Sequence, residues 1–333
     1  MVELLKIGIV FFIVLLLTFK KVNLWIALLV GTFLLGFLFH LPFQSIGRDL
    51  FTSIIDTGTL LLLGAFIAIL FFSNLLKETG RMAEILEGFR IIFKDIRVVI
   101  ALIPAMIGLM PIVGGALVSA PMVVEGSDEL KLSPERRTFI NYWFRHVWQY
   151  TLPTYPSLIL AATLVKVPVR YLGWINLPLT LVAIVSGIFF GFWGVSKSTG
   201  VKPLSNTTAG LRLFYNLCPL LFGLILVVGF QVELAYAFGL AILGMIIFYK
   251  IGWLVFLKGL RESINMELLL TVAIVMGFKK VLESSGAIHS VSSVLLSSGV
   301  PLWLIAILVP LLVGVITGVT IAPIAISFPV LIP

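Results

Sequence analysis

Apolar residues occur along the chain in long runs separated by short polar segments. A transmembrane helix needs about 20 mostly apolar residues, and most of these runs approach or exceed that length. The runs cover residues 4–19, 22–39, 59–76, 98–124, 139–165, 174–195, 213–230, 232–249, 267–282 and 301–333. This pattern predicts an all-α, polytopic membrane protein.

Two of the runs contain residues that a straight helix does not tolerate. The run 98–124 includes Pro111 and the pair Gly114-Gly115, and the run 139–165 includes Pro153. Proline removes a backbone donor and clashes with the preceding turn, so a helix opens there. An opened backbone inside a bilayer must be buried in protein or line a wet cavity, because lipid offers no hydrogen bonds. The breaks therefore predict a binding site at membrane depth.

Basic residues indicate whether the run 98–124 crosses the membrane or returns as a re-entrant hairpin. Cytoplasmic loops collect Lys and Arg. With a hairpin and an external N-terminus, 16 of the 23 Lys and Arg lie in cytoplasmic loops, 6 lie outside and Arg145 lies within a span. A crossing would turn the basic segments 197–212 and 250–261 outward. We therefore expect a hairpin, an external N-terminus and a location in the cell (inner) membrane.

The second part of the chain resembles the first at offsets of 206 and 208 residues. Glycine and proline matches are informative because each marks a backbone requirement. Five crossings precede the second copy, and an odd number inverts it, which is the inverted-topology repeat typical of secondary transporters. The matched pairs include Gly31 and Gly239, Gly80 and Gly286, Pro104 and Pro310, Ser119 and Ser327, and Pro121 and Pro329.

The repeat predicts two domains and a linker. The first repeat, 1–195, contains three helices, an amphipathic interfacial helix over 79–93, the hairpin 98–124, a broken helix over 139–165 and a closing helix over 174–195. A cytoplasmic linker, 196–211, leads to the inverted second repeat, 212–333. That repeat lacks counterparts of the broken and closing helices, so we expect a C-terminally truncated chain or half of a split system. A naturally asymmetric protein is the alternative.

Composition excludes several classes of protein. Of the 333 residues 60% are hydrophobic and 11% are charged, against about 45–50% and about 25% in a soluble domain. Soluble enzymes and disordered chains are thereby excluded. The single Cys218 excludes an intramolecular disulfide and a multi-cysteine metal site. The net charge of +8 is spread without a basic stretch, so we expect no nucleic-acid partner.

The arrangement of hairpin and broken helix resembles the ion-transporter superfamily of citrate, dicarboxylate, gluconate, arsenite and some sodium/proton carriers. Residues 111–121, Pro-Ile-Val-Gly-Gly-Ala-Leu-Val-Ser-Ala-Pro, resemble an uncharacterised prokaryotic family of integral membrane proteins within it. The resemblance implies elevator-type alternating access and a homodimer. The Ser-Asn-Thr signature of the dicarboxylate carriers does not occur at the expected hairpin tips, so the solute and the coupling ion stay open.

The candidate site residues lie at the two hairpin tips and at the helix break. Freed amides and carbonyls at half-helix ends bind ions in transporters, and hydroxyl oxygens suit a cation. Tight packing, Thr back-bonding to its own helix and a simple proline kink are the competing interpretations. The candidates are Pro111, Val113, Gly114 and Gly115 with Ser119, then Thr151, Pro153, Thr154 and Tyr155, and finally Thr317, Gly318 and Thr320 in a second tip over 316–320.

Two ionisable residues precede the break. Burial of an ionisable group in a membrane is costly and marks a functional site. Arg145 has the geometry to hold a carboxylate by a bidentate pair, and His146 to relay a proton. The alternative is that both lie at the interface, where Arg extends its charge to water.

We expect an ion-coupled secondary transporter of a small solute, an organic or inorganic anion, rather than an enzyme. Na⁺ or H⁺ is the expected coupling ion. Apart from Na⁺ at the hairpin tips we expect no bound metal, and we expect no other cofactor. The lipid bilayer and the solute are the expected partners. A permease subunit of an ATP-driven system and a non-transporting assembly protein are the alternatives. The chain carries no Gly-x-x-x-x-Gly-Lys-Ser/Thr loop, so it does not hydrolyse ATP by that route.

Overall fold

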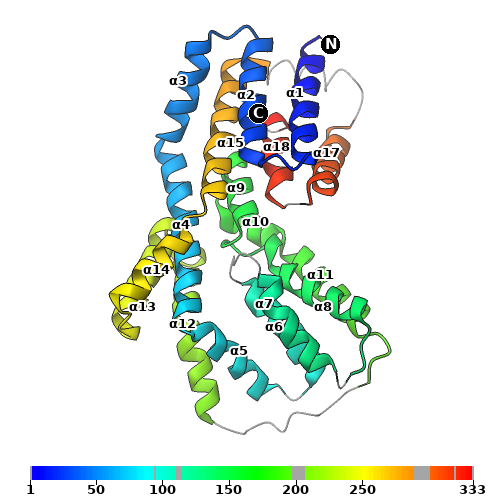
Figure 1. Cartoon of the computed structure of the whole chain (residues 1–333), viewed down its shortest axis with the longest axis vertical. Helices are drawn as coiled ribbons and strands as arrows, with labels where there is room; N and C mark the ends of the chain where they lie inside the picture. Colours follow the sequence, from blue (N-terminus) through cyan, green and yellow to red (C-terminus); the bar gives the residue numbers. More distant parts are fainter. Residues whose placement is uncertain are drawn as a thin grey trace. The chain divides into compact units, whose positions relative to one another are not determined.

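The computed structural model describes residues 2–93, 95–109, 115–128, 130–196, 207–287, 301–318 and 320–331, and every regular element within these ranges is helical (Figure 1). The elements of the first part of the chain are α1 Val2–Phe19, α2 Leu24–Leu38, α3 Phe43–Ile54, α4 Thr57–Glu78, α5 Arg81–Ile92, α6 Ile96–Gly108, α7 Gly115–Ser127, α8 Pro134–His146 and the 3₁₀ turn η1 Val147–Tyr150. The later elements are α9 Pro156–Val165, α10 Val169–Ile175, α11 Leu177–Phe192, α12 Thr207–Val228, α13 Leu234–Tyr249, α14 Trp253–Ser263, α15 Met266–Ser284, α17 Leu302–Thr317 and α18 Ile321–Leu331.

Each predicted apolar run contains at least one helix, which confirms an all-α polytopic membrane protein. Among the described residues, α4 and the segment Gly210–Val228 of α12 are each long and apolar enough to cross a membrane alone. The bent pair of α9 and α10 makes a third span if it is counted as one, and the other apolar helices are shorter. The amphipathic helices α3 and α14 were not predicted.

The chain folds into two compact units. Unit 1 comprises residues 1–64, 159–167 and 265–333, and unit 2 comprises 65–158 and 168–264. Both units are built from segments that lie far apart in the sequence.

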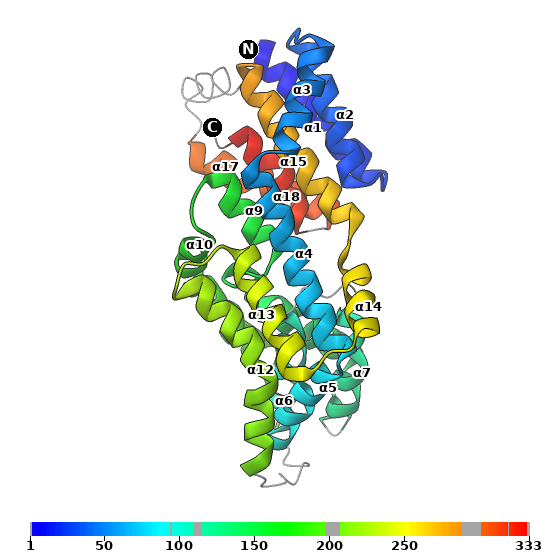
Figure 2. The same cartoon turned by 90° about the vertical axis from the view of Figure 1, so that its left-hand side faces the viewer.

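In unit 1, α15 packs along α2 and α3 (Figures 1 and 2). A Cβ on Gly277 of α15 would lie 2.4 Å from Leu50 Cδ2 of α3, so glycine permits the close approach of the two helices. Helices α17 and α18 pack against each other around a turn at Gly318, whose φ of 65° suits glycine. Helices α17 and α18 thus form a packed pair at the place where the second hairpin is predicted.

In unit 2, α4 packs on α13 and α14 through aromatic side chains. The rings of Phe72 and Phe238 meet edge to face at 5.3 Å, and those of Phe71 and Phe256 at 5.1 Å. Such pairs add about 0.5–1.5 kcal/mol to the burial of the rings. Helix α12 lies beside α13 (Figure 2) and contacts α5.

The order of helices recurs along the chain, with α1, α2, α3, α4, α6 and α7 repeated as α12, α13, α14, α15, α17 and α18. Buried positions recur too. In α2 and α13, Leu24, Ala27, Leu28 and Leu35 correspond to Leu234, Ala237, Phe238 and Met245, so the register there is 234 − 24 = 210. The expected match of Gly31 with Gly239 is wrong, because Gly31 lies against Val14 whereas a Cβ on Gly239 would meet open space.

Each unit combines parts of the two predicted repeats. Unit 1 joins α1, α2 and α3 of the first copy to α15, α17 and α18 of the second, and unit 2 joins α12, α13 and α14 to α5, α6, α7 and most of α4. The contact of Phe72 with Phe238 in unit 2 has its counterpart in unit 1, where Phe278 and Leu28 line one small internal gap. Neither unit therefore coincides with one predicted repeat.

Candidate functional site

The candidate site in unit 2 is built on the hairpin of α6 and α7. Asp95 caps α6 by accepting a hydrogen bond from the backbone N–H of Arg97 at 3.0 Å. The two helices pack along each other, and a Cβ on Gly126 near the end of α7 would lie 2.6 Å from Ile100 Cγ2 near the start of α6. Helices α6 and α7 therefore lie along each other over residues 98–124, and their return to the same face of the membrane stays a prediction.

The tip of this hairpin falls mainly on residues that the structure does not describe. Pro111, Val113 and Gly114 lie outside the described residues, so their expected ligand contacts stay predictions. Gly115 is the first residue of α7.

The helix break lies between α8 and α9 and supplies hydrogen-bond donors to the end of α6. Trp148 Nε1 donates to the Ala105 carbonyl at 2.9 Å, and Thr154 Oγ1 donates to the Leu109 carbonyl at 3.3 Å. The Ala105 carbonyl also accepts the backbone N–H of Leu109 at 3.1 Å, whereas carbonyls beyond the last turn of a helix have no partner within it, and an unpaired carbonyl away from water is costly. The break thus acts as a side-chain cap for the hairpin arm.

Tyr155 joins the hairpin arm to α8. Its hydroxyl lies 2.5 Å from the Gly108 carbonyl of α6 and 3.0 Å from the Arg145 carbonyl of α8, and donates its proton to this pair of acceptors. A Cβ on Gly108 would lie 2.1 Å from the Arg145 carbonyl oxygen. Only glycine permits the two backbones to approach so closely.

The remaining break residues contact α10 and α11. Thr151 Oγ1 lies 3.2 Å from Thr180 Oγ1, which also lies 3.2 Å from the Val147 carbonyl, and a Cβ on Gly173 would lie 2.6 Å from the Thr151 carbonyl. Pro153 is buried. Of the hydroxyls predicted to touch a ligand, those of Thr154 and Tyr155 bind carbonyls of the opened backbone, whereas that of Thr151 contacts another hydroxyl.

Polar side chains on α7 and α8 complete the site. The hydroxyl of Ser119, which is fully buried, donates to Asn141 Oδ1 at 2.5 Å. The side chain of Arg145 is half-buried, and His146 stacks on Tyr142 with its Nδ1 2.7 Å from the Tyr142 carbonyl. Ser119, Arg145, Thr154 and Tyr155 thus come from three elements of one unit.

The residues predicted at the second tip belong to unit 1. The hydroxyl of Thr317 donates to the Val313 carbonyl of its own helix at 2.8 Å. This contact agrees with the alternative interpretation, in which a threonine hydroxyl bonds back to its own helix. Gly318 adopts a left-handed backbone, and Thr320 is exposed. In the described part of this hairpin the fully buried hydroxyl of Ser327, the counterpart of Ser119, has no hydrogen-bond partner.

Sequence reasoning missed three polar residues in apolar surroundings. Asn141 is the partner of Ser119, and the buried Gln149 Oε1 in η1 has no hydrogen-bond partner among the described residues. Lys279 in α15 is buried and donates to the Leu164 carbonyl at the end of α9 at 3.2 Å. The available signal for all three was a polar residue inside an apolar run.

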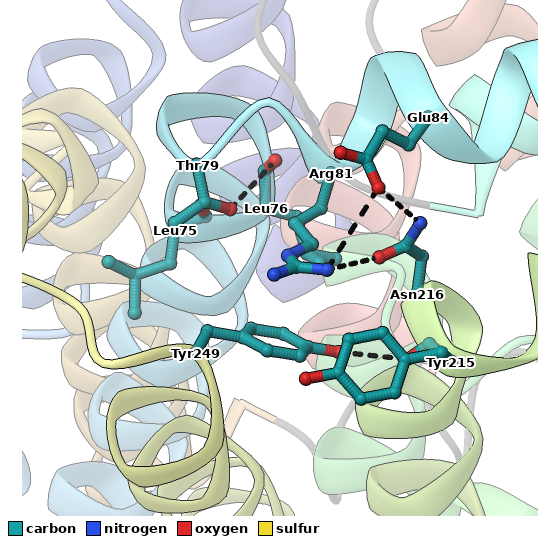
Figure 3. A network of polar contacts seen from close by, with 8 residues as sticks. All are labelled: Leu75, Leu76, Thr79, Arg81, Glu84, Tyr215, Asn216 and Tyr249. Carbon is teal, nitrogen blue, oxygen red and sulfur yellow. Dashed lines mark hydrogen bonds and ion pairs between the residues drawn. The ribbon is translucent and has the colours of Figure 1, made fainter. Parts of the chain in front are cut away.

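A further polar network joins α5 to α12 (Figure 3). Arg81 donates to the buried amide oxygen of Asn216 at 2.6 Å, and the amide nitrogen of Asn216 donates to Glu84 at 2.7 Å. The guanidinium of Arg81 also lies 3.8 Å from the centroid of the Tyr249 ring, a cation–π contact. The apolar face of α5, with Met82, Ile85 and Leu86, is buried in the protein. The helix predicted over 79–93 is therefore present and is held by protein contacts.

Comparison with known families adds one finding. A family model described as "Protein of unknown function (DUF401)" matches residues 4–333. The chain belongs to the DUF401 family. The expected membership of an uncharacterised family is confirmed at this level, while the DUF401 match leaves the ion-transporter superfamily a prediction. No curated protein matches the chain.

Proposed function

We propose that this DUF401 protein is an ion-coupled secondary transporter of a small anionic solute, and that it belongs to the ion-transporter superfamily. The observation that carries the proposal is the hairpin of α6 and α7, whose arm ends against a broken helix. Non-helical backbone at membrane depth is tolerated where it is buried in protein or lines a water-filled cavity. Transporters use such discontinuous helices to bind solute.

The charge of the site favours an anion. Arg145 contributes a guanidinium on the last turn of α8, next to the break, and this group binds carboxylates through paired hydrogen bonds. Solute bound at the hairpin and the break would contact Arg145, with His146 and a Na⁺ or H⁺ gradient providing the coupling.

The recurrence of helices supports alternating access. Each unit pairs the first three helices of one copy with the fourth helix and hairpin of the other. Reciprocal contacts between equivalent surfaces are what a two-fold relation produces, and inverted repeats with such a relation alternate between two faces of the membrane. We propose a homodimer in the cell membrane with its N-terminus outside.

Uptake by the full-length chain in proteoliposomes tests the function. Labelled citrate, succinate, gluconate and arsenite are offered with an inward Na⁺ gradient, an inward H⁺ gradient or neither. The proposal expects gradient-dependent uptake of at least one solute. Arg145→Gln should abolish this uptake and Arg136→Gln should retain it, because Arg136 is only partly buried and donates to the Trp193 carbonyl away from the break. Absence of ion-dependent uptake and of solute binding across the whole panel would overturn it.

A further inference from the structure

A groove of about 380 Å³ runs along the hairpin arm within unit 2. Its walls are formed by α6, by the end of α8 with η1, and by α11, with Ala101, Ala105, Trp148 and Ile184 among the lining residues. Asp95 and Arg97 lie at the start of α6, and the other described lining side chains are apolar. The volume and the small number of polar groups match a ligand site.

The charged end of the groove is built from an ion pair. Arg97 Nη2 lies 2.7 Å from Asp95 Oδ2, Nε donates to the same carboxylate, and Nη1 donates to the Val195 carbonyl at 3.0 Å. These bonds use three of the five N–H donors that a guanidinium offers. Hydrogen bonding to Asp95 raises the pKa of Arg97 above its usual value, so its positive charge persists at all physiological pH values.

The apolar part of the groove follows α6 and opens to the side. Val98 and Ile188 in its walls remain 37% and 53% exposed, and the neighbouring Leu181 and Val185 of α11 are also exposed. Trp148 lies at the other end, where its ring nitrogen donates to the Ala105 carbonyl. Because residues 98–124 and 174–195 are apolar segments of a membrane protein, we expect the open side to face lipid and Asp95 and Arg97 to lie at the level of the headgroups.

We propose that this groove binds one acyl chain of a zwitterionic phospholipid, with the phosphate against Arg97 and the ammonium group against Asp95. The chain fills the apolar channel between α6 and α11. An anionic headgroup is less suitable, because the carboxylate of Asp95 repels it while the net charge of the pair is zero. The bound lipid would stabilise the position of the hairpin arm relative to α11. This role does not depend on which solute the protein transports.

Photolabelling tests the site. Full-length protein is placed in vesicles of phosphatidylethanolamine and phosphatidylglycerol that contain a trace of phosphatidylethanolamine with a diazirine in one acyl chain. Labelled peptides are mapped by mass spectrometry. We expect adducts on α6 and α11 well above those on the exposed face of α17 around Leu311, which reports ordinary surrounding lipid.

Filling the groove provides the decisive variant. Ala101→Trp displaces at least two methylene groups of the acyl chain, so labelling of α6 and α11 should fall about tenfold. Ala101→Leu should give an intermediate loss, and Val182→Trp, at an exposed position of α11 that does not line the groove, should change nothing. The thermal unfolding midpoint in detergent reports whether each variant is folded, and labelling at α17 reports equal exposure to lipid. Equal labelling in wild type and Ala101→Trp, with α17 unchanged, would overturn the proposal.

Headgroup specificity is measured with matched probes of phosphatidylethanolamine, phosphatidylglycerol and free fatty acid. We expect phosphatidylethanolamine to label the groove most strongly. Asp95→Asn should shift the preference toward phosphatidylglycerol, and Arg97→Gln should weaken labelling by both phospholipids. Groove labelling by phosphatidylglycerol or fatty acid that equals or exceeds labelling by phosphatidylethanolamine would contradict the assignment of a zwitterionic lipid.

Discussion

Tyr155 holds together two pieces of backbone that a regular helix would have satisfied by itself. Its ring belongs to the break, while its hydroxyl reaches carbonyls at the ends of α6 and α8. The sequence placed Tyr155 in the break but did not identify these acceptors, because they come from residues 47 and 10 positions away.

Tyr155→Phe keeps the ring and removes only the hydroxyl. The carbonyls of Gly108 and Arg145 would then lose a donor, which should lower the free energy of unfolding by about 1–3 kcal/mol. The thermal unfolding midpoint in detergent measures the loss. Tyr142→Phe, at an exposed position on α8, is the control and should leave the midpoint unchanged. Equal midpoints for Tyr155→Phe and wild type would show that the hydroxyl is not needed.

Gly108→Ala should separate the hairpin arm from α8. The new Cβ would lie 2.1 Å from a backbone oxygen of Arg145, which cannot rotate away. We expect a cost of about 1–3 kcal/mol from overpacking, despite the better helix propensity of alanine. Gly239→Ala, on α13, meets open space and should be neutral or stabilising. A Gly108→Ala protein as stable as Gly239→Ala would contradict the close approach.

Lys279 is a buried cation in α15, and its neighbour Lys280 is exposed. Removing the ammonium leaves the Leu164 carbonyl without this donor, which costs about 1–3 kcal/mol, while buried ionisable groups in membranes serve function. Lys279→Met should therefore lower the thermal midpoint by no more than this one lost hydrogen bond and lose gradient-driven uptake. Lys280→Met should change neither. Retained uptake in Lys279→Met would assign Lys279 to capping of α9 alone.

At the scale of elements, helix length explains which helices the sequence revealed. A search for apolar runs of membrane length finds α4 and α12, and it also finds the proline-broken runs. It does not find α3 or α14, which have 12 and 11 residues and carry polar positions between apolar ones. Their buried faces are small, with Ser53 in α3 and Gly259 and Ser263 in α14 among the buried residues. Small residues give no hydropathy signal, although they permit close packing.

The contact between α5 and α12 depends on Asn216. Asn216→Ala would leave Arg81 and Glu84 without their shared partner, and hydrogen bonds to charged groups contribute about 1.5–3 kcal/mol each. We expect faster amide hydrogen exchange along α5, measured by mass spectrometry, with less effect on the hairpin of α6 and α7. Cys218→Ala, at an exposed position of the same helix, is the control. Unchanged exchange in α5 would show that its apolar face alone holds the helix.

At the scale of the whole molecule, the recurrence of helices has a topological consequence. If the second copy is inverted, the equivalent helices α3 and α14 lie at opposite faces of the membrane, with α3 outside. Single cysteines replacing Asp49 and Lys258, in a Cys218→Ser background, should then react with an impermeant thiol reagent from opposite sides of oriented vesicles. Reaction from the same side would exclude inverted repeats. A permeant reagent, which reaches both sides of the vesicle, measures the total reactivity of each cysteine as a control.

The sequence by itself determined the local features of this protein. Run length and composition predicted an all-α membrane chain, and Pro153 marked a place where a helix must open, because these properties belong to each segment alone. Gly80 and Gly286, matched in the sequence, both adopt a left-handed backbone near 70°.

Only the tertiary structure decided which segments complete one another. Leu28 shares a gap with Phe278, Phe72 packs on Phe238, and Trp148 caps a carbonyl of α6. The hydropathy of a segment does not specify its packing partner, because any apolar stripe can pack on any other. The donor that binds an opened carbonyl depends on the three-dimensional positions of the two groups. The exchange of helices between the two copies, and the hydroxyls that close the break, therefore appear only when the chain is folded.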